Sequence, residues 1–412
     1  MIIIIEGVAA ATPFSKEGIM PQNNLTALIL GILGSCAVLL SLFFNVKSTN
    51  EVPNHKAMIT VPCKPIETLE ERESITFIMG EDHDSDNPYY TEALNYYLHN
   101  PTAQTDHVVN HCHSLIAVRN YLEKHSPKNG LPWGLVNVVL HSNEWSGLGV
   151  PVFDGGTRSS LTSINQAVAN GDFLPLDNHT MDSQTEMVLH ACALGKNQAM
   201  LKAISHAFGG DLSDQERPIV RSSKYFIFYE STKYNGIPQE CHRYLSDAKY
   251  AFYKMGYRPG DIRLSQQLQE RYPNAKTNWR EALTRTSPRF LGDTYHHTFE
   301  VPIIWTVTYP DVSERPDLST KAAQEIWLNA QPELDEAIQQ FGIPKDKFNW
   351  VFKNIEYTFE DGVTEPGIKA VGYCTVLCVL QTLTQPDANK PNQSLAFIPE
   401  LTDEQYYAVE KP

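Results

Sequence analysis

Two short apolar runs, each followed by a reactive side chain, constrain the fold of this 412-residue chain more than any other feature. Residues 135–140 (LVNVVL) lead directly into His141, and residues 186–191 (EMVLHA) lead directly into Cys192. Short aliphatic runs between polar turns are typical of strands buried on both faces, as in parallel sheets covered by helices. The sequence therefore predicts an α/β protein with a doubly wound, mostly parallel sheet.

The two reactive side chains follow strands that we expect to be neighbours. The carboxyl ends of parallel strands meet at one edge of a sheet, where chemistry gathers in open α/β folds. An imidazole can take the proton of a thiol and leave a thiolate, which is the stronger nucleophile. We therefore predict that Cys192 is a nucleophile and that His141 is its general base.

The spacing and local sequence of these two residues resemble a known superfamily. Cys192 lies 51 residues after His141, and a catalytic histidine about 50 residues upstream of the cysteine is typical of caspases. With VVLHS at 138–142 and VLHACALG at 188–195, residues 74–230 resemble the caspase-like cysteine peptidases, which include caspases, metacaspases, legumains, gingipains and CHAT domains. The Cys-x-x-Gly spacing is closer to CHAT domains than to animal caspases.

This resemblance implies a thiol endopeptidase that acts on a peptide or protein and needs neither a cofactor nor a metal. It also implies that the backbone N–H groups of Ser142 and Cys192 hold the negative oxygen of the tetrahedral intermediate. The family usually has glycine directly after the histidine, whereas this chain has Ser142. A second hypothesis is therefore a catalytically degenerate caspase-like domain that acts as a binding or signalling module.

Other interpretations of the same residues stay open at this point. A cysteine buried at a strand end is often a small apolar side chain without chemistry. His190 shares a strand face with Cys192 if the strand continues that far, so it is a second candidate base. A zinc-dependent hydrolase using clustered His and Asp residues is a third hypothesis, although the sequence contains neither a CxxC nor an HExxH pattern.

The substrate preference does not follow from the sequence, because loops assemble the pocket for the substrate side chain in this fold. The candidate substrate-binding residues are charged side chains of these loops: Asp82, Asp84, Glu144, Asp154 and Arg221.

Composition narrows the class of partner. The formal net charge of −15 argues against nucleic acid, since nucleic-acid binding depends on clustered Lys and Arg. Seven scattered cysteines do not resemble a disulfide framework, and their odd number predicts at least one free thiol. The oligomeric state is not indicated.

The N-terminal region contains the one apolar run long enough to span a bilayer. Residues 25–46 carry no charge and follow a polar segment, 1–24. We expect a single transmembrane helix, with a cleaved signal peptide as the alternative and a lipoprotein cleavage box at 33–36 as a weaker one. The polar, proline-containing residues 47–73 read as a linker. Three lysines lie in that linker and only Lys16 before the run, which weakly favours a cytoplasmic body.

The rest of the chain is divided by its hydrophobic patterns. We expect the catalytic domain to cover residues 74–235, with strands at 75–79, 106–109 and 224–229 besides the two above. Apolar positions at helical spacing predict a helix over 241–255 within a helical extension, 236–290. Residues 291–412 alternate strand and helix patterns, which predicts an α+β C-terminal region.

Overall fold

The computed structural model describes residues 3–6, 72–82, 88–103, 105–210, 217–288, 291–359, 362–387, 390 and 394–411. The transmembrane helix expected at 25–46, nearly all of the linker, and Asp84 lie outside these residues. No helix in the described ranges is long and apolar enough to cross a membrane.

The first sheet is mostly parallel, as the sequence predicts. Its order is β16-β8-β7-β4-β2-β3, and only the edge strand β16 runs antiparallel to its neighbour. We call it the parallel sheet. Its strands are β2 (Ser74–Ile78), β3 (His107–Val109), β4 (Leu135–Val139), β7 (Glu186–His190), β8 (Ile219–Ser223) and β16 (Tyr407–Glu410).

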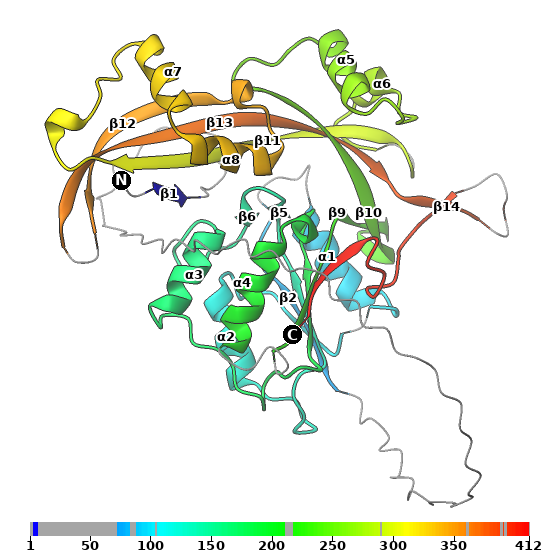
Figure 1. Cartoon of the computed structure of the whole chain (residues 1–412). Coiled ribbons are helices and arrows are strands. Elements are labelled where there is room, and N and C mark those ends of the chain that lie inside the picture. The colour runs from blue at the N-terminus through cyan, green and yellow to red at the C-terminus, as the bar shows by residue number, and fades with distance from the viewer. Residues whose placement is uncertain are drawn as a thin grey trace, which may run out of the picture. The chain divides into compact units, whose positions relative to one another are not determined.

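Helices cover both faces of the parallel sheet (Figure 1). On one face, Phe77, Val138 and Leu189 pack against α2 (Leu115–Lys124), α3 (Leu161–Ala169) and α4 (Gln198–Gly209). On the other face, Ile78 and Val139 pack against the tyrosines of α1 (Tyr89–His99). Strands buried on two sides are mostly apolar, and the buried polar residues among them, Thr76, Asn137 and His190, are hydrogen-bonded to one another.

The helices begin where the sequence supplies caps. Ser114 accepts a hydrogen bond from the Ala117 N–H at the start of α2, and Ser160 and Ser163 form a capping box at the start of α3. Asn197 accepts from the Met200 N–H at the start of α4. Such caps satisfy N–H groups that have no partner inside the helix.

A second, antiparallel sheet contains most of the C-terminal half and is separate from the parallel sheet. We call it the antiparallel sheet. Its order is β1-β11-β13-β10-β9, and β12 also pairs with β13 (Figure 1). Its strands are β1 (Ile3–Glu6), β9 (Phe226–Tyr234), β10 (Ile237–Lys254), β11 (Thr294–Thr308), β12 (Asn349–Thr358) and β13 (Thr364–Thr382).

Helices lie on both faces of the antiparallel sheet as well. The helices α5 (Asp261–Arg271) and α6 (Trp279–Ala282) pack on the face that carries Tyr253 and Leu377. The helices α7 (Lys321–Asn329) and α8 (Pro332–Phe341) pack on the opposite face. The smaller elements are β5 (Ser142–Asn143), β6 (Gly147–Leu148), β14 (Thr384–Pro386), β15 (Ser394–Ala396), η1 (Leu194–Lys196), η2 (Val312–Glu314) and η3 (Lys345–Lys347).

Two expectations about the order of elements are wrong. The helix expected at 241–255 is the long strand β10, which pairs with β13 from Ser246 to Lys254. Both faces of β10 are buried over Tyr250–Tyr253, so apolar residues do not alternate with polar ones there. Their spacing is therefore compatible with a helix as well as with a strand. The last parallel strand is β8, not 224–229, and most of the latter range belongs to β9 in the antiparallel sheet.

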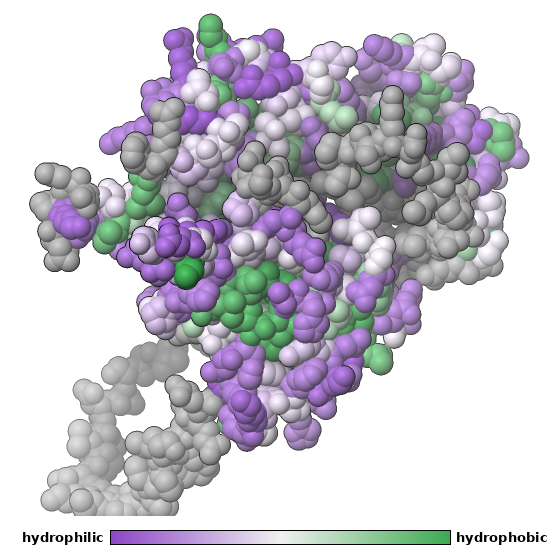
Figure 2. Space-filling model, turned by 180° about the vertical axis from the view of Figure 1, so that it is seen from behind, coloured by the Kyte–Doolittle hydropathy of each residue, from purple (hydrophilic) through white to green (hydrophobic). Residues whose placement is uncertain are grey.

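The surface on one side of the molecule is mostly hydrophilic. On the face shown in Figure 2, hydrophilic side chains predominate and hydrophobic ones gather in separate areas. The apolar residues of the described chain are largely in the clusters that line the two sheets.

Candidate active site

The structure brings the ends of β4 and β7 together at one edge of the parallel sheet. The two strands are parallel neighbours, and Val139 is paired with His190. The Leu140 N–H donates to the His190 carbonyl at 3.2 Å. His141 and Cys192 each follow this last pair by two residues, so they occupy corresponding positions beyond the two strands.

His141 lies in an aromatic setting. Its ring stacks on Tyr89 with centroids 4.5 Å apart and meets the edge of Tyr90 at 4.8 Å. Its backbone N–H donates to the Tyr90 hydroxyl at 3.2 Å. Burial lowers the pKa of His141 to about 4, against an opposing effect of Asp82 and with a smaller contribution from Arg158. The imidazole is therefore neutral at pH 7 and able to accept a proton.

Cys192 is buried as a neutral thiol. Its side chain is 7% exposed, and Sγ–H donates to the Ile227 carbonyl at 3.6 Å. Burial raises the pKa of Cys192 to about 11. Among the described residues no hydrogen bond joins Cys192 to His141. In this conformation the thiol is not activated as a nucleophile.

The covering elements come from the antiparallel sheet. Cys192 and the next residue, Ala193, belong to the apolar cluster that includes Tyr250 and Tyr295 of that sheet. Ile227, the acceptor of the thiol proton, belongs to β9. The carboxyl edge of the parallel sheet is therefore buried beside Cys192 rather than open to solvent.

The backbone directly after Cys192 is strained. Ala193 has φ of 54°, one of two positive values among described non-glycine residues, and this region is unfavourable for a side chain with a Cβ. The Ala193 N–H donates to the Tyr225 carbonyl at 3.0 Å, which helps to hold this turn. The helix α4 begins only at Gln198, so its dipole is too distant to stabilise a thiolate at Cys192.

The segment after His141 forms a fixed loop. Ser142 opens the β5–β6 hairpin, and its hydroxyl donates to the Gly147 carbonyl at 3.0 Å. The Asn143 side-chain oxygen accepts from the backbone N–H groups of Trp145 and Ser146. Trp145 in turn donates from Nε1 to the Phe341 carbonyl at 2.8 Å. These contacts fix the position of Ser142, whose N–H is one of the predicted oxyanion donors.

The predicted substrate-binding residues are not gathered in one pocket. Glu144 pairs with Lys196 at 2.7 Å, which links the loops that follow the two strands. Asp82 accepts from the N–H groups of Tyr90 and Thr91 at the start of α1. Asp154 accepts from the Ser114 hydroxyl at 2.6 Å and is exposed.

Arg221 lies away from the other candidates. Its guanidinium bonds to both oxygens of Glu186, at the amino end of β7. The pair lies toward the end of the sheet opposite to Cys192. Sequence order alone cannot show this, because a residue in mid-strand can point to either end of its sheet.

A cavity of about 570 Å³, which we call the strand-end cavity, lies where the order of the parallel strands reverses. Ligands of doubly wound folds bind at such a switch point. Its acidic and histidine residues are Glu81, Asp82, His113 and His141, and Cys192 does not line it. The remaining lining residues are Met79, Gly80, Tyr90, Gly149, Val150 and Pro151.

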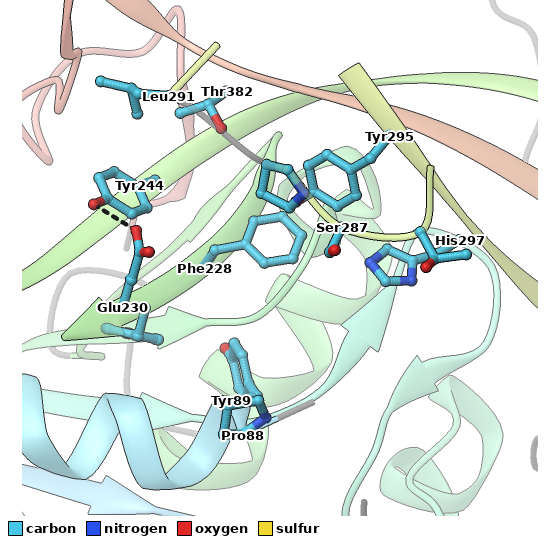
Figure 3. Close-up of a pocket in the computed structure, with 13 residues that line it drawn as sticks. Pro88, Tyr89, Phe228, Glu230, Tyr244, Ser287, Leu291, Tyr295, His297 and Thr382 are labelled. Atoms are coloured by element: carbon cyan, nitrogen blue, oxygen red, sulfur yellow. Dashed lines mark hydrogen bonds between the residues drawn. The ribbon is translucent and has the colours of Figure 1, made fainter. Parts of the chain in front are cut away.

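A second cavity, of about 360 Å³, has Tyr89 in its wall (Figure 3). We call it the aromatic pocket, because aromatic residues, among them Tyr89, Phe228, Tyr244 and Tyr295, line much of it. Glu230 accepts a hydrogen bond from the Tyr244 hydroxyl at 2.9 Å on one side of it. The others in its wall are Pro88, Tyr229, Thr286, Ser287, Pro288, Leu291, His297 and Thr382.

Tyr89 and Tyr295 connect the aromatic pocket to the thiol, and sequence reasoning missed both. The pKa of Tyr89 is raised by burial and then by the Cys192 thiol, and that of Tyr295 by burial, Cys378 and Cys192. The Tyr89 hydroxyl also donates to the His190 carbonyl at 3.0 Å. Tyr89 directly follows Asn87-Pro88, a pair typical of a helix start, which was the available signal. Tyr295 lies far along the chain and had none.

His190, the second candidate base, is engaged elsewhere. Its Nε2 lies 2.9 Å from Asn137 Oδ1 and its Nδ1 lies 3.5 Å from an Arg243 nitrogen. Burial, followed by the charge of Arg243, lowers its pKa well below the usual value. Its ring therefore belongs to a polar network inside the sheet rather than to the thiol.

The described cysteines form no disulfide and no metal site. Cys112, Cys192, Cys241, Cys374 and Cys378 are free and buried, which confirms the expectation of at least one free thiol. Within the described ranges, no three His, Cys, Asp or Glu side chains gather as metal ligands would.

The buried His141 predicts a loss of stability in acid. Its pKa is about 4 in the folded chain and about 6.5 when unfolded. Between these two pH values the unfolded chain binds more protons than the folded chain. The stabilisation of the folded chain by a neutral His141 is therefore complete above pH 6.5 and is lost as pH falls toward 4. We expect wild type to lose about 2 kcal/mol more than His141→Gln between pH 7.5 and pH 5, measured by urea unfolding. Equal losses would contradict a neutral, buried imidazole.

Comparison with protein-family models, with curated proteins and with solved structures gives no match for this chain.

Proposed function

We propose that this chain is a cysteine-dependent amide hydrolase of caspase-like type, with Cys192 as nucleophile and His141 as general base. The observation that supports this most is the register of β4 and β7, which gives the imidazole and the thiol corresponding positions beyond adjacent parallel strands. A neutral imidazole and the strained Ala193 backbone beside the thiol are further support, since strain of this kind collects at functional sites.

The chemistry assigns each group one task. His141 takes the thiol proton, and the Cys192 sulfur attacks the substrate carbonyl carbon to form a tetrahedral oxyanion. Backbone N–H groups of Ser142 and Cys192 stabilise that oxyanion. His141 then gives its proton to the leaving amine as the C–N bond breaks, and water releases the acid product from the thioester.

This reaction requires the thiol to leave its resting partner. Sγ–H is bound to the Ile227 carbonyl and is covered by the antiparallel sheet. We therefore propose that the described conformation is a closed one and that substrate or a partner moves β9 away from Cys192. The membrane attachment expected for residues 25–46 would restrict such substrates to those near a membrane, and it stays a prediction.

A degenerate binding domain is the second candidate. The specific observation in its favour is the thiol pKa of about 11, which leaves almost no thiolate at neutral pH. In that case the caspase-like domain would only position a binding surface, and the Ser142 substitution would cause no loss.

Thiol labelling together with peptide cleavage separates these candidates. The full chain is treated with iodoacetamide from pH 7 to 10, labelled sites are quantified by mass spectrometry, and a fluorogenic peptide library is tested in parallel. If the chain is a hydrolase, we expect it to cleave library peptides, and a peptide that it cleaves should slow the labelling of Cys192 more than that of Cys112. Cys112 is the comparison because it is also a buried thiol that donates to a backbone carbonyl. The binding domain predicts no cleavage and labelling of Cys192 that only rises about tenfold per pH unit.

A further inference from the structure

A third cavity, of about 490 Å³, contains a buried guanidinium. We call it the Arg243 cavity. It lies between α1, the amino ends of β4 and β7, and the loop 398–402. Arg243 projects into it from β10, and Tyr96 and Tyr97 approach from α1. Nothing in the proposed hydrolysis uses these residues.

The Arg243 charge has no anionic partner among the described residues. Its Nε is buried without a hydrogen-bond acceptor, and no ion pair within the described ranges includes it. Glu186 also lines the cavity, but both of its oxygens are taken by Arg221. Glu400 lines the exposed side and makes no ion pair with Arg243 in the described part of the chain.

The groups that do face the guanidinium are neutral. The guanidinium carbon lies 5.8 Å from the centre of the Tyr96 ring, a contact that stabilises a cation only modestly. The nearest ring nitrogen belongs to His190, at 3.5 Å, and this imidazole is itself kept uncharged by burial. Burial raises the pKa of the neighbouring Tyr97 to about 12, so its hydroxyl is also uncharged at pH 7.

An unpaired buried charge is costly, and an anion that enters the cavity removes that cost. The fork of an arginine matches the two oxygens of a carboxylate. One guanidinium balances one negative charge, which favours a monoanion. Ile398, Pro399 and Leu401 form an apolar wall of the cavity. A volume of this size is typical of small-molecule sites.

We propose that the Arg243 cavity binds a small organic monocarboxylate, with the carboxylate on Arg243 and the apolar body between Tyr96 and Leu401. The site is independent of the hydrolase: it needs neither Cys192 nor His141, and it would exist in the degenerate binding domain as well.

Calorimetric titration of the full chain with benzoate tests this site, with inorganic phosphate and sulfate as comparison anions. We expect saturable binding of benzoate with one site, at least tenfold tighter than phosphate or sulfate. Arg243→Gln should weaken it at least tenfold, Arg243→Lys should weaken it through loss of the fork, and Tyr97→Phe should retain it within about threefold. Arg271→Gln is the matched control, because Arg271 also lies over aromatic rings but on the surface.

The contrary outcomes are distinct. No saturable anion binding by wild type overturns the site, and so does benzoate binding that Arg243→Lys and Arg243→Gln leave unchanged. Preference for phosphate or sulfate overturns the assignment of a monocarboxylate. Should Arg243→Gln fail to fold, Arg243→Lys keeps the buried charge and still removes the bidentate geometry, so the comparison with Arg271→Gln remains decisive.

Discussion

Replacing Cys192 with alanine is expected to reduce peptide cleavage at least ~1,000-fold, to the level of the uncatalysed reaction in the assay. The sulfur is the atom that forms the covalent bond in the proposed reaction, and no neighbouring group can replace it. The free energy of unfolding should fall by only about 1 kcal/mol, because alanine removes one buried Sγ that packs in the apolar cluster and donates a weak hydrogen bond to Ile227. Cleavage of the most responsive library peptide, with urea unfolding alongside, measures both effects.

The matched control for that variant is Cys112→Ala. Cys112 is also buried and its Sγ–H also donates to a backbone carbonyl, that of Ala117, at 3.7 Å. Its loss should cost similar stability and leave cleavage unchanged. Undiminished cleavage by Cys192→Ala would rule out the nucleophile, and equal losses in both variants would attribute the effect to folding.

The parallel sheet could be predicted because the sequence of each strand carries its own signal. Residues 135–140 and 186–191 are apolar except for Asn137, Glu186 and His190, and runs so rich in aliphatic residues are typical of strands covered on both faces. The positions of His141 and Cys192 at the ends of adjacent strands follow from that pattern together with the rule for parallel connections. In contrast, β8 contains Arg221, Ser222 and Ser223, which are buried but polar, so hydrophobicity could not reveal it.

The covering of the site was not predictable, because it depends on contacts between distant segments. Ile227 accepts the thiol proton from a strand that the sequence assigned to the wrong sheet. Tyr295 approaches the thiol from β11, about a hundred residues further along the chain. No spacing or composition near Cys192 indicates either contact, and yet they decide whether the thiol is ionised.

The charged candidates show a related difficulty. Asp82 and Arg221 were chosen because charged residues often line pockets. Asp82 holds the start of α1 and also lines the strand-end cavity, whereas Arg221 is paired with Glu186 away from that cavity. A charge near a strand end can stabilise the fold or bind a substrate, and only its partners distinguish the two. Arg243, which lacks such a partner among the described residues, was hidden in a segment predicted to be a helix.

Gly195→Ala is expected to destabilise the chain by about 3 kcal/mol or more, because there is no space for a Cβ at this position. A Cβ on Gly195 would lie 2.8 Å from the Ser223 carbonyl carbon, 2.9 Å from its oxygen, and closer still to the Ser222 carbonyl oxygen. These are backbone atoms of β8, which is held between β7 and β16 and cannot move aside. The glycine of the Cys-x-x-Gly motif therefore has a structural reason that does not depend on catalysis: it lets η1 approach the next strand and so fixes the turn that presents Cys192.

Gly260→Ala is the control, since nothing lies within 4 Å of a Cβ there, and it should cost at most about 1 kcal/mol at the start of α5. Urea unfolding of both variants measures the difference, and a Gly195→Ala protein as stable as Gly260→Ala would mean that η1 does not pack against β8 as the structure has it.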